Sequence, residues 1–343
     1  MTDSEPSLSI ISSVALPEAG DDVVDESEVE ADVELRQLRA PLESHGKRVD
    51  SALAVAVPEF SRSYLQQLIA AGLVQVNGVT VSKVSQAVRA FDEIRIELRP
   101  TPQSQAFKPE AMALDVVFED EFLLVINKPA GLVVHPAPGN WRGTLLNGLL
   151  ARDADAGLLP RAGIVHRLDK DTSGLMVVAR KRLVMDELVR MIASRSVSRQ
   201  YIAIAHGAWA GAATRNVNLP VGRDPRNRLR MAVVDMDRNP GKTASTDISV
   251  LQTNLDYCVV RCKLHTGRTH QIRVHMAALG HPLVADEMYG GRNVMGLERQ
   301  ALHACRLAFD HPITGKPLAF SSSLPKDLLT VAVALGLRYN PEE

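Results

Sequence analysis

Residues 163–174 read GIVHRLDKDTSG, a stretch with two carboxylates and three residues able to carry positive charge between positions 166 and 171. A solvated turn that neutralises itself would explain such a mixture. Apolar residues flank the charges, however, at 164–165 and at 175–178. We therefore expect a charged loop between core strands, in which a partly desolvated carboxylate needs a cationic partner to stay ionised. Loops on a rigid scaffold often carry catalytic groups, so this loop is the first candidate for a functional site.

The sequence on either side of this loop predicts a domain in which strands outnumber helices. One helix is expected at 181–194, where apolar residues recur at helical spacing, and another near 269–279. Because the helices occur irregularly among the strands, the pattern favours an α+β fold over a doubly wound parallel sheet. Short β-rich runs, separated by Gly and Pro turns, occur at 116–118, 123–127, 175–179, 201–206 and 257–264.

A second, smaller unit is predicted at residues 46–98. Two short helices, the second capped by Ser61, precede a hairpin. The hairpin turn Asn77-Gly78 suits the positive φ angles of a type I′ turn, and residues 92–98 alternate as a strand. Residues 99–113 contain three prolines and are expected to be a linker, which leaves 114–343 as the larger domain.

Charge is distributed unevenly along the chain. Residues 1–45 contain twelve Asp or Glu against Arg36 and Arg39, so this segment carries −10. The whole chain has a formal net charge of −1, and the remainder is therefore +9. We expect 1–45 to be a solvated, disordered acidic leader, and the basic remainder to be suited to a polyanionic partner.

Cysteine usage and hydropathy exclude several classes of protein. Cys258, Cys262 and Cys305 cannot form a disulfide framework and are expected to be buried thiols, as in a reducing compartment. The acidic start lacks the basic, then apolar, pattern of a signal peptide, and no apolar run approaches the length of a membrane helix. The expected location is the cytoplasm, without membrane attachment.

Several motifs together resemble one known family. The stretch at 163–174 resembles the HRLD signature of the RluA family of pseudouridine synthases, and PRAGIVHRLDKD at 160–171 is similar to its RluD-like branch. The resemblance covers roughly residues 46–343. Several long motifs in the right order are more specific than one short pattern. The others are INKP at 126–129, VVHP at 133–136, LHTGRTHQIRVH at 264–275, GHPL at 280–283 and YGG at 289–291.

The resemblance implies a fold and a set of roles. The family fold is a mixed, mostly antiparallel sheet with flanking helices and a central RNA cleft, and 46–98 resembles the S-four RNA-binding module. Asp169 matches the catalytic aspartate, and Tyr201 matches the tyrosine that stacks on the base and helps to remove the carbon-5 proton. Arg273 matches the basic residue that pairs with the catalytic carboxylate. Arg167 matches an arginine that replaces the target base in its stack.

The implied reaction explains why these residue types suffice. A uridine's glycosidic bond breaks, the base rotates, and it rejoins the sugar through carbon 5. No redox change occurs, so we expect no nucleotide, metal or other cofactor. A carboxylate can trap the electron-poor sugar carbon, as in retaining glycosidases, or attack the base. The sequence does not choose between these routes.

Other residues have weaker assignments. Arg268 is expected to bind phosphate or to pair locally, and His166, grouped with the substrate-binding residues, is better suited to a structural hydrogen bond than to a general base. Arg167 could alternatively pair with a carboxylate of its own loop. The spacing of His265, His270, His275 and His281 matches no common zinc pattern. Lys47, Arg48, Arg62, Lys83 and Arg89 are candidate phosphate contacts of the small module, with ordinary surface cations as the alternative.

Rival functions were weighed against the synthase. A P-loop around Gly241-Lys242-Thr243 fails because Met236 occupies the position that needs Gly. A non-catalytic RNA-binding ribosome-assembly factor would not need Asp169, Tyr201 and Arg273. A related synthase could act on another ribosomal or transfer RNA site. The expected partner is ribosomal RNA or the precursor of the large ribosomal subunit, bound by a monomer. Ala285 stands where the family pattern has Gly.

Overall fold

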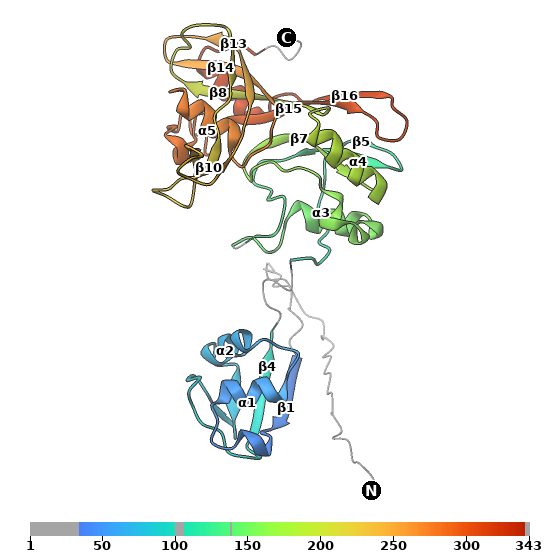
Figure 1. Cartoon of the computed structure of the whole chain (residues 1–343), viewed down its shortest axis with the longest axis vertical. Coiled ribbons are helices and arrows are strands. Elements are labelled where there is room, and N and C mark those ends of the chain that lie inside the picture. The colour runs from blue at the N-terminus through green and yellow to red at the C-terminus, as the bar shows by residue number, and fades with distance from the viewer. Residues whose placement is uncertain (1–33, 100–105, 138, 340–343) are drawn as a thin grey trace, which may run out of the picture. The chain divides into compact units, whose positions relative to one another are not determined.

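The computed structural model describes residues 34–99, 106–137 and 139–339, which belong to two compact units divided after Ser104 (Figure 1). The division falls within the predicted linker, 99–113. Among the described residues, no helix combines the length and the apolar character that a membrane crossing requires.

The N-terminal unit is a small sheet with two helices. The helices are α1 (Val49–Ala56) and α2 (Arg62–Ala70), and the Ser61 hydroxyl caps α2 by accepting the Tyr64 N–H at 3.3 Å. Asn77 and Gly78 have φ of 50° and 78°, so the hairpin turn forms as predicted. A core of buried aliphatic side chains joins helices and sheet. The sheet order is β1-β4-β2-β3, with β1 Glu34–Arg39, β2 Val74–Val76, β3 Val79–Thr80 and β4 Glu93–Leu98.

The segment predicted to be a disordered acidic leader contains strand β1. The expectation of disorder throughout 1–45 is wrong for residues 34–45, because β1 pairs antiparallel with β4 along its whole length, from Glu34 opposite Leu98 to Arg39 opposite Glu93. Leu38 also packs against the core of the unit. Acidic composition concealed this short strand, whose stability comes from pairing with a distant segment. The rest of the predicted leader, 1–33, lies outside the described residues.

The larger unit is built on one mixed sheet, in agreement with the predicted α+β class. Its order is β5-β6-β7-β15-β8-β14-β13-β9, with β16 paired to β15. Every neighbouring pair is antiparallel except β7 and β15. The strands are β5 Val116–Glu119, β6 Leu123–Lys128, β7 Ser173–Ala179, β8 Ser198–His206, β9 Thr214–Val217, β13 Thr246–Thr253, β14 Tyr257–Leu264, β15 Leu302–Asp310 and β16 Pro317–Ser321.

Strand β15 connects two halves of this sheet. It lies between β7, which follows the charged loop, and β8, which carries Tyr201. Ala304 is opposite Gly174 on one side and opposite Tyr201 on the other. A Cβ on Gly174, whose φ is +117°, would lie 2.3 Å from the Ala304 carbonyl oxygen, so the close parallel pairing requires glycine.

Helices cover both faces of the sheet. Helix α4 (Arg182–Ala193) packs beside β7 over one core, and α6 (Lys326–Ala334) covers a second. Side chains of α3 (Leu145–Arg152) and α5 (Gln271–Ala278) join the largest core, to which Tyr201 also belongs. The three cysteines are buried free thiols, as predicted.

Two smaller features border these layers. A three-stranded sheet of β10 (Val221–Arg223), β11 (Met231–Val233) and β12 (Gly241–Lys242) has β11 next to α5 (Figure 1). In the predicted linker, residues 100–105 lie outside the described part of the chain. Residues that follow them pack on α3, since the Asn147 amide donates to the carbonyls of Ala106 and Lys108 at 3.2 and 2.8 Å.

Candidate active site

Contacts with β7 fix the start of the charged loop, and a turn closes its end. Ile164 forms a bridge to Val178, and the Val177 N–H donates to His166 Nε2 at 3.1 Å. At the other end the Thr172 N–H donates to the Asp169 carbonyl at 3.1 Å, which closes a turn before β7 begins. The loop therefore leads into the core strand β7, but the strand expected before it is absent, since a 3-10 helix, Pro160–Gly163, and a single bridge residue, Ile164, precede it.

A buried lysine side chain fixes the loop through hydrogen bonds to backbone carbonyls. The Lys128 ammonium is almost completely buried and donates to the carbonyls of Pro129, Leu132 and Lys170 at 2.7–2.9 Å. Burial lowers its pKa to about 8, and the nearby Asp171 and Asp169 charges oppose that shift. Sequence analysis missed this residue because Asn-Lys-Pro alone does not show that the lysine turns inward.

Two further residues, from the segment before β15, tie down the end of the loop. Arg299 Nη1 donates to the Asp171 carbonyl at 3.1 Å, and the Gln300 amide donates to the Thr172 hydroxyl at 3.1 Å. Arg299 is itself paired with Asp327 of α6 at 2.6 Å. Segments more than a hundred residues apart therefore fix the position of the loop.

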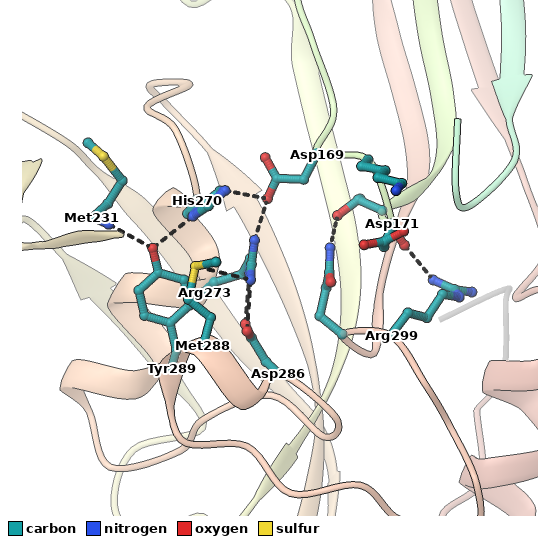
Figure 2. Close-up of polar contacts among 12 residues, drawn as sticks. Asp169, Asp171, Met231, His270, Arg273, Asp286, Met288, Tyr289 and Arg299 are labelled. Carbon is teal, nitrogen blue, oxygen red and sulfur yellow. Dashed lines mark hydrogen bonds and ion pairs between the residues drawn. The ribbon is translucent and has the colours of Figure 1, made fainter. Parts of the chain in front are cut away.

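The Asp169 carboxylate projects from this loop toward α5 (Figure 2). Arg273 Nη1 donates to Asp169 Oδ2 at 3.2 Å, and the two side chains are 7% and 17% exposed. The predicted pairing of these residues is thus present in the structure. The carboxylate lies beside a cation and is still accessible, as a reacting group must be.

Arg273 is itself fixed by a second carboxylate. Its Nε and Nη2 atoms donate to Asp286 at 2.7 and 2.8 Å, and the Asp286 side chain is 1% exposed. The guanidinium carbon also lies 4.9 Å from the centre of the Tyr289 ring (Figure 2). The sequence motifs near Asp286 and Tyr289 indicated no role for either residue. The ion pair between Arg273 and Asp286 joins residues thirteen positions apart, and no local sequence pattern indicates such a pair.

The segment that carries Asp286 has an unusual backbone. Ala285 adopts φ of +59°, which explains why the family pattern has Gly at this position. A Cβ on Gly291 would lie 1.8 Å from the Leu283 carbonyl oxygen, so this position requires glycine. The segment is consequently a tight loop that brings Asp286 under Arg273.

His270 and Tyr289 complete the surroundings of Asp169. His270 Nε2 lies 3.9 Å from Asp169 Oδ2, and its Nδ1 lies 2.8 Å from the Tyr289 hydroxyl. That hydroxyl also accepts the Met231 N–H from β11 at 3.0 Å (Figure 2). The sequence gave no signal for this contact beyond the LHTGRTHQIRVH motif.

Tyr201 lies on β8 and is 5% exposed. Burial raises the pKa of its phenol to about 12, the Arg199 charge opposes the rise, and the Asp169 charge adds to it. Its hydroxyl makes no hydrogen bond within the described part of the chain. Tyr201, Asp169 and Arg273 therefore belong to one region of the larger unit, and the roles predicted for them remain predictions.

The other predicted substrate contacts differ in their environment. Arg167 is exposed and pairs with no described carboxylate, so the alternative of a local ion pair is not observed. Arg268 Nε donates to the Thr243 carbonyl at 3.0 Å. His166 accepts from the backbone of Val177, and burial lowers its pKa to about 3, as suits a neutral structural residue.

His265, His275 and His281, the other histidines of the spacing considered for zinc, each have a protein partner. His265 pairs with Asp247 at 2.6 Å, His275 with the Thr246 hydroxyl at 2.9 Å, and the His281 ring with the His206 carbonyl at 3.0 Å. Among the described residues, no three His, Cys, Asp or Glu side chains gather as metal ligands would.

The five basic residues predicted for the small module are all exposed. Arg48 and Arg62 both pair with the buried Asp50 carboxylate at 3.0 Å. Burial, the largest contribution, favours a higher Asp50 pKa, but hydrogen bonds from Arg48, Gln66 and Arg62 together lower this pKa to about 2. These two arginines thus have a structural partner, whereas Lys47, Lys83 and Arg89 form no ion pair with any carboxylate of the residues that the structure describes.

Two family profiles and several relatives match this chain. The RNA pseudouridylate synthase profile matches residues 122–278, and the S4 domain profile matches 47–94. The chain is 46% identical over 313 residues to ribosomal large subunit pseudouridine synthase D of Neisseria meningitidis serogroup B, covering 88% of this chain and 82% of that protein. It is 42% identical to the protein of the same name from Xanthomonas campestris pv. campestris, covering 91% of this chain and 96% of the relative.

A solved structure supports the fold. Human RNA pseudouridylate synthase domain containing 4 aligns over 66% of this chain and 94% of its own, with a TM-score of 0.52 and 24% identity. This likeness concerns the larger unit's architecture. With the relatives' identity across most of their length, the evidence shows that the chain belongs to the RNA pseudouridine synthase family and carries an S4 domain ahead of its synthase domain.

Proposed function

We propose that this enzyme converts specific uridines of large-subunit ribosomal RNA to pseudouridine, with Asp169 as the catalytic carboxylate. The observation that carries the proposal is the accessible Asp169 carboxylate held against the buried Arg273. The names of the bacterial relatives support the choice of ribosomal RNA, and the S4 domain supports RNA as the ligand of the small unit.

The chemistry assigned to Asp169 follows from its accessible carboxylate beside Arg273. In one route the carboxylate bonds to the electron-poor sugar carbon C1′ as the bond to uracil N1 breaks, and the uracil leaves with the electron pair; in the other the carboxylate adds to the base before that bond breaks. The uracil turns, a bond forms between its carbon 5 and C1′, and the bond to Asp169 breaks, which returns the carboxylate. The carbon-5 proton leaves and N1 gains a proton, so atoms and electrons balance without a cofactor.

Tyr201 and Arg167 serve the target base in this proposal. A phenol with a pKa of about 12 stays protonated at neutral pH, so Tyr201 offers a flat surface for stacking and a hydroxyl that passes the carbon-5 proton onward. Removing the uridine from its helix costs a few kcal/mol. The exposed, unpaired Arg167 guanidinium is planar and fills the vacated place in the stack.

Tritium release from RNA labelled at uridine carbon 5 tests the proposal. Wild-type protein is expected to release tritium from large-subunit ribosomal RNA, and Asp169→Asn to lose more than about 1,000-fold of the rate while keeping its fold. Asp171→Asn is the matched control, since it removes the same charge two positions away and should retain most activity. Turnover by Asp169→Asn near the wild-type rate would refute the catalytic assignment.

A second measurement addresses the substrate. Pseudouridines are mapped in the ribosomal RNA of cells that lack the protein, with and without a copy that encodes Asp169→Asn. Missing sites in the large-subunit RNA that only the wild-type copy restores would support the proposal. Loss of transfer RNA sites alone would favour a related synthase with another target, and intact pseudouridines with defective subunits would favour an assembly factor.

A further inference from the structure

We propose that His270 is a positioning residue that, as a neutral imidazole protonated on Nε2, holds Asp169 Oδ2 together with Arg273 and leaves Oδ1 as the oxygen that meets the substrate. The inference rests on the proposed role of Asp169. It assigns a task to a residue outside the expected catalytic set.

Arg273 and His270 both approach the same oxygen of Asp169. Arg273 Nη1 lies 3.2 Å and His270 Nε2 lies 3.9 Å from Oδ2 (Figure 2). Among the described residues, no side chain or backbone group donates to Oδ1, and Oδ1 is not among the fully buried unpaired atoms. One carboxylate oxygen is therefore held by the protein, and the other is open.

The hydrogen bonds of Tyr289 determine the proton on His270. The Tyr289 oxygen accepts the Met231 N–H at 3.0 Å, and its own O–H needs an acceptor, which His270 Nδ1 provides at 2.8 Å. A proton on Nδ1 would leave that O–H without a described partner and would turn a bare Nε2 lone pair toward the Asp169 carboxylate. The Nε2–H tautomer satisfies both ends of the ring.

The backbone and the packing restrain the ring in this orientation. His270 is the N-cap of α5, with φ of 55° in the left-handed region, and its ring meets the Tyr289 ring edge-on at 5.7 Å. Burial lowers the His270 pKa, which keeps the ring neutral, while the charges of Asp169 and Asp286 oppose this and those of Arg273 and Arg167 add to it.

A neutral donor suits a carboxylate that must react. It orients Oδ2 without adding a second positive charge beside Arg273, so the free oxygen keeps its electron density. The gap from Nε2 to Oδ2 must shorten by about 1 Å to become a hydrogen bond, and such contacts commonly tighten when substrate binds. We therefore expect His270 to affect turnover more than RNA affinity.

Four variants separate positioning from simple folding. His270→Gln places an amide N–H where Nε2–H lies, whereas His270→Asn tolerates the left-handed backbone but reaches only as far as Nδ1. We expect His270→Ala and His270→Asn to lose roughly tenfold in kcat with KM nearly unchanged, and His270→Gln to recover most of the rate. His265→Ala, whose ring pairs with Asp247, is the control and should keep wild-type kcat.

Nitrogen-15 NMR of labelled histidine reads the tautomer directly, with His270→Gln identifying the signals. The expected result is one protonated nitrogen, Nε2, in wild type and a mixture of tautomers in Tyr289→Phe. A wild-type ring protonated on Nδ1 or on both nitrogens at neutral pH would overturn the proposal, as would equal rates for the Gln and Asn variants or a change in KM alone. If wild type modifies no RNA, the proposed function fails, yet the spectrum still decides the tautomer.

Discussion

Arg273 donates two hydrogen bonds to Asp286, at 2.7 and 2.8 Å, and so reaches Asp169 with only one remaining nitrogen. We predict that Asp286→Asn lowers both stability and kcat, because the buried guanidinium loses its main anionic partner and an amide N–H₂ opposes it. Breaking a buried ion pair costs about 3–5 kcal/mol. Urea unfolding and tritium release measure the two effects. Glu287→Gln, next in sequence and exposed, should change neither by much.

Lys128 predicts an unusual dependence of stability on pH. Its pKa falls from 10.5 to about 8 in the folded chain because the ammonium is buried. Between those values the unfolded chain binds more protons, so this group's contribution to the free energy of unfolding rises as the pH rises through that window and is constant below it. Relative to that of Lys128→Met, the free energy of unfolding of the wild type should increase by roughly 1–3 kcal/mol between pH 7.5 and 10. A constant difference between the two proteins would contradict the buried, charged lysine.

Ala285 predicts a stabilising substitution beside the site. Its φ of +59° is costly for a residue with a Cβ, and Ala285→Gly should raise the free energy of unfolding by about 1 kcal/mol. Ala278→Gly in the right-handed helix α5 is the matched control and should lower it by up to about 1 kcal/mol. Equal effects of the two substitutions in a denaturant titration would mean that Ala285 is not strained.

Strand β1 predicts where an N-terminal truncation begins to matter. Removing residues 1–45 deletes the partner of β4 and exposes that strand's edge, so RNA binding by the N-terminal unit and its resistance to proteolysis should fall. Removing only 1–33 keeps the strand and serves as the control. If both truncations behave alike in limited proteolysis, β1 does not support the unit.

The three-stranded sheet next to α5 predicts an RNA contact. Arg226 and Arg228 are exposed on the turn between β10 and β11, while Arg230 is paired with Asp224. Replacing either exposed arginine with Ala should weaken RNA binding and reduce the slope of log affinity against log salt by about one. Arg182→Ala on α4, where the side chain pairs with Asp186, should leave that slope unchanged.

Local patterns predicted many of the helices and strands but not the contacts between distant ones. The helix at 181–194 and the strands near 123–127 and 257–264 follow from apolar spacing and turn residues, which are properties of neighbouring positions. Strand β1 escaped prediction because its composition resembles a solvated tail and its stability depends on β4. Strand β15 was not predicted at all, although it lies at the centre of the sheet.

The site residues also divide into those that motifs predicted and those that only the tertiary structure reveals. Asp169, Tyr201 and Arg273 were found through motifs, and the structure brings Asp169 and Arg273 into contact. Asp286 and His270 were not predicted to belong to the site. The role of each depends on contact with another side chain, Arg273 for Asp286 and Asp169 for His270. Their selection depends on tertiary geometry that no residue spacing encodes.

The place of β15 in the sheet has a consequence for synthesis on the ribosome. Ala304 aligns Gly174 with Tyr201, so the two halves of the sheet stay unregistered until residues 302–310 have left the exit tunnel. A nascent chain that ends before these residues already contains the S4 domain, the loop with Asp169 and the helix with Arg273. Its candidate active site is nevertheless not yet assembled. We expect such long-range closure to slow folding and to delay the onset of activity until strand β15 has been synthesised.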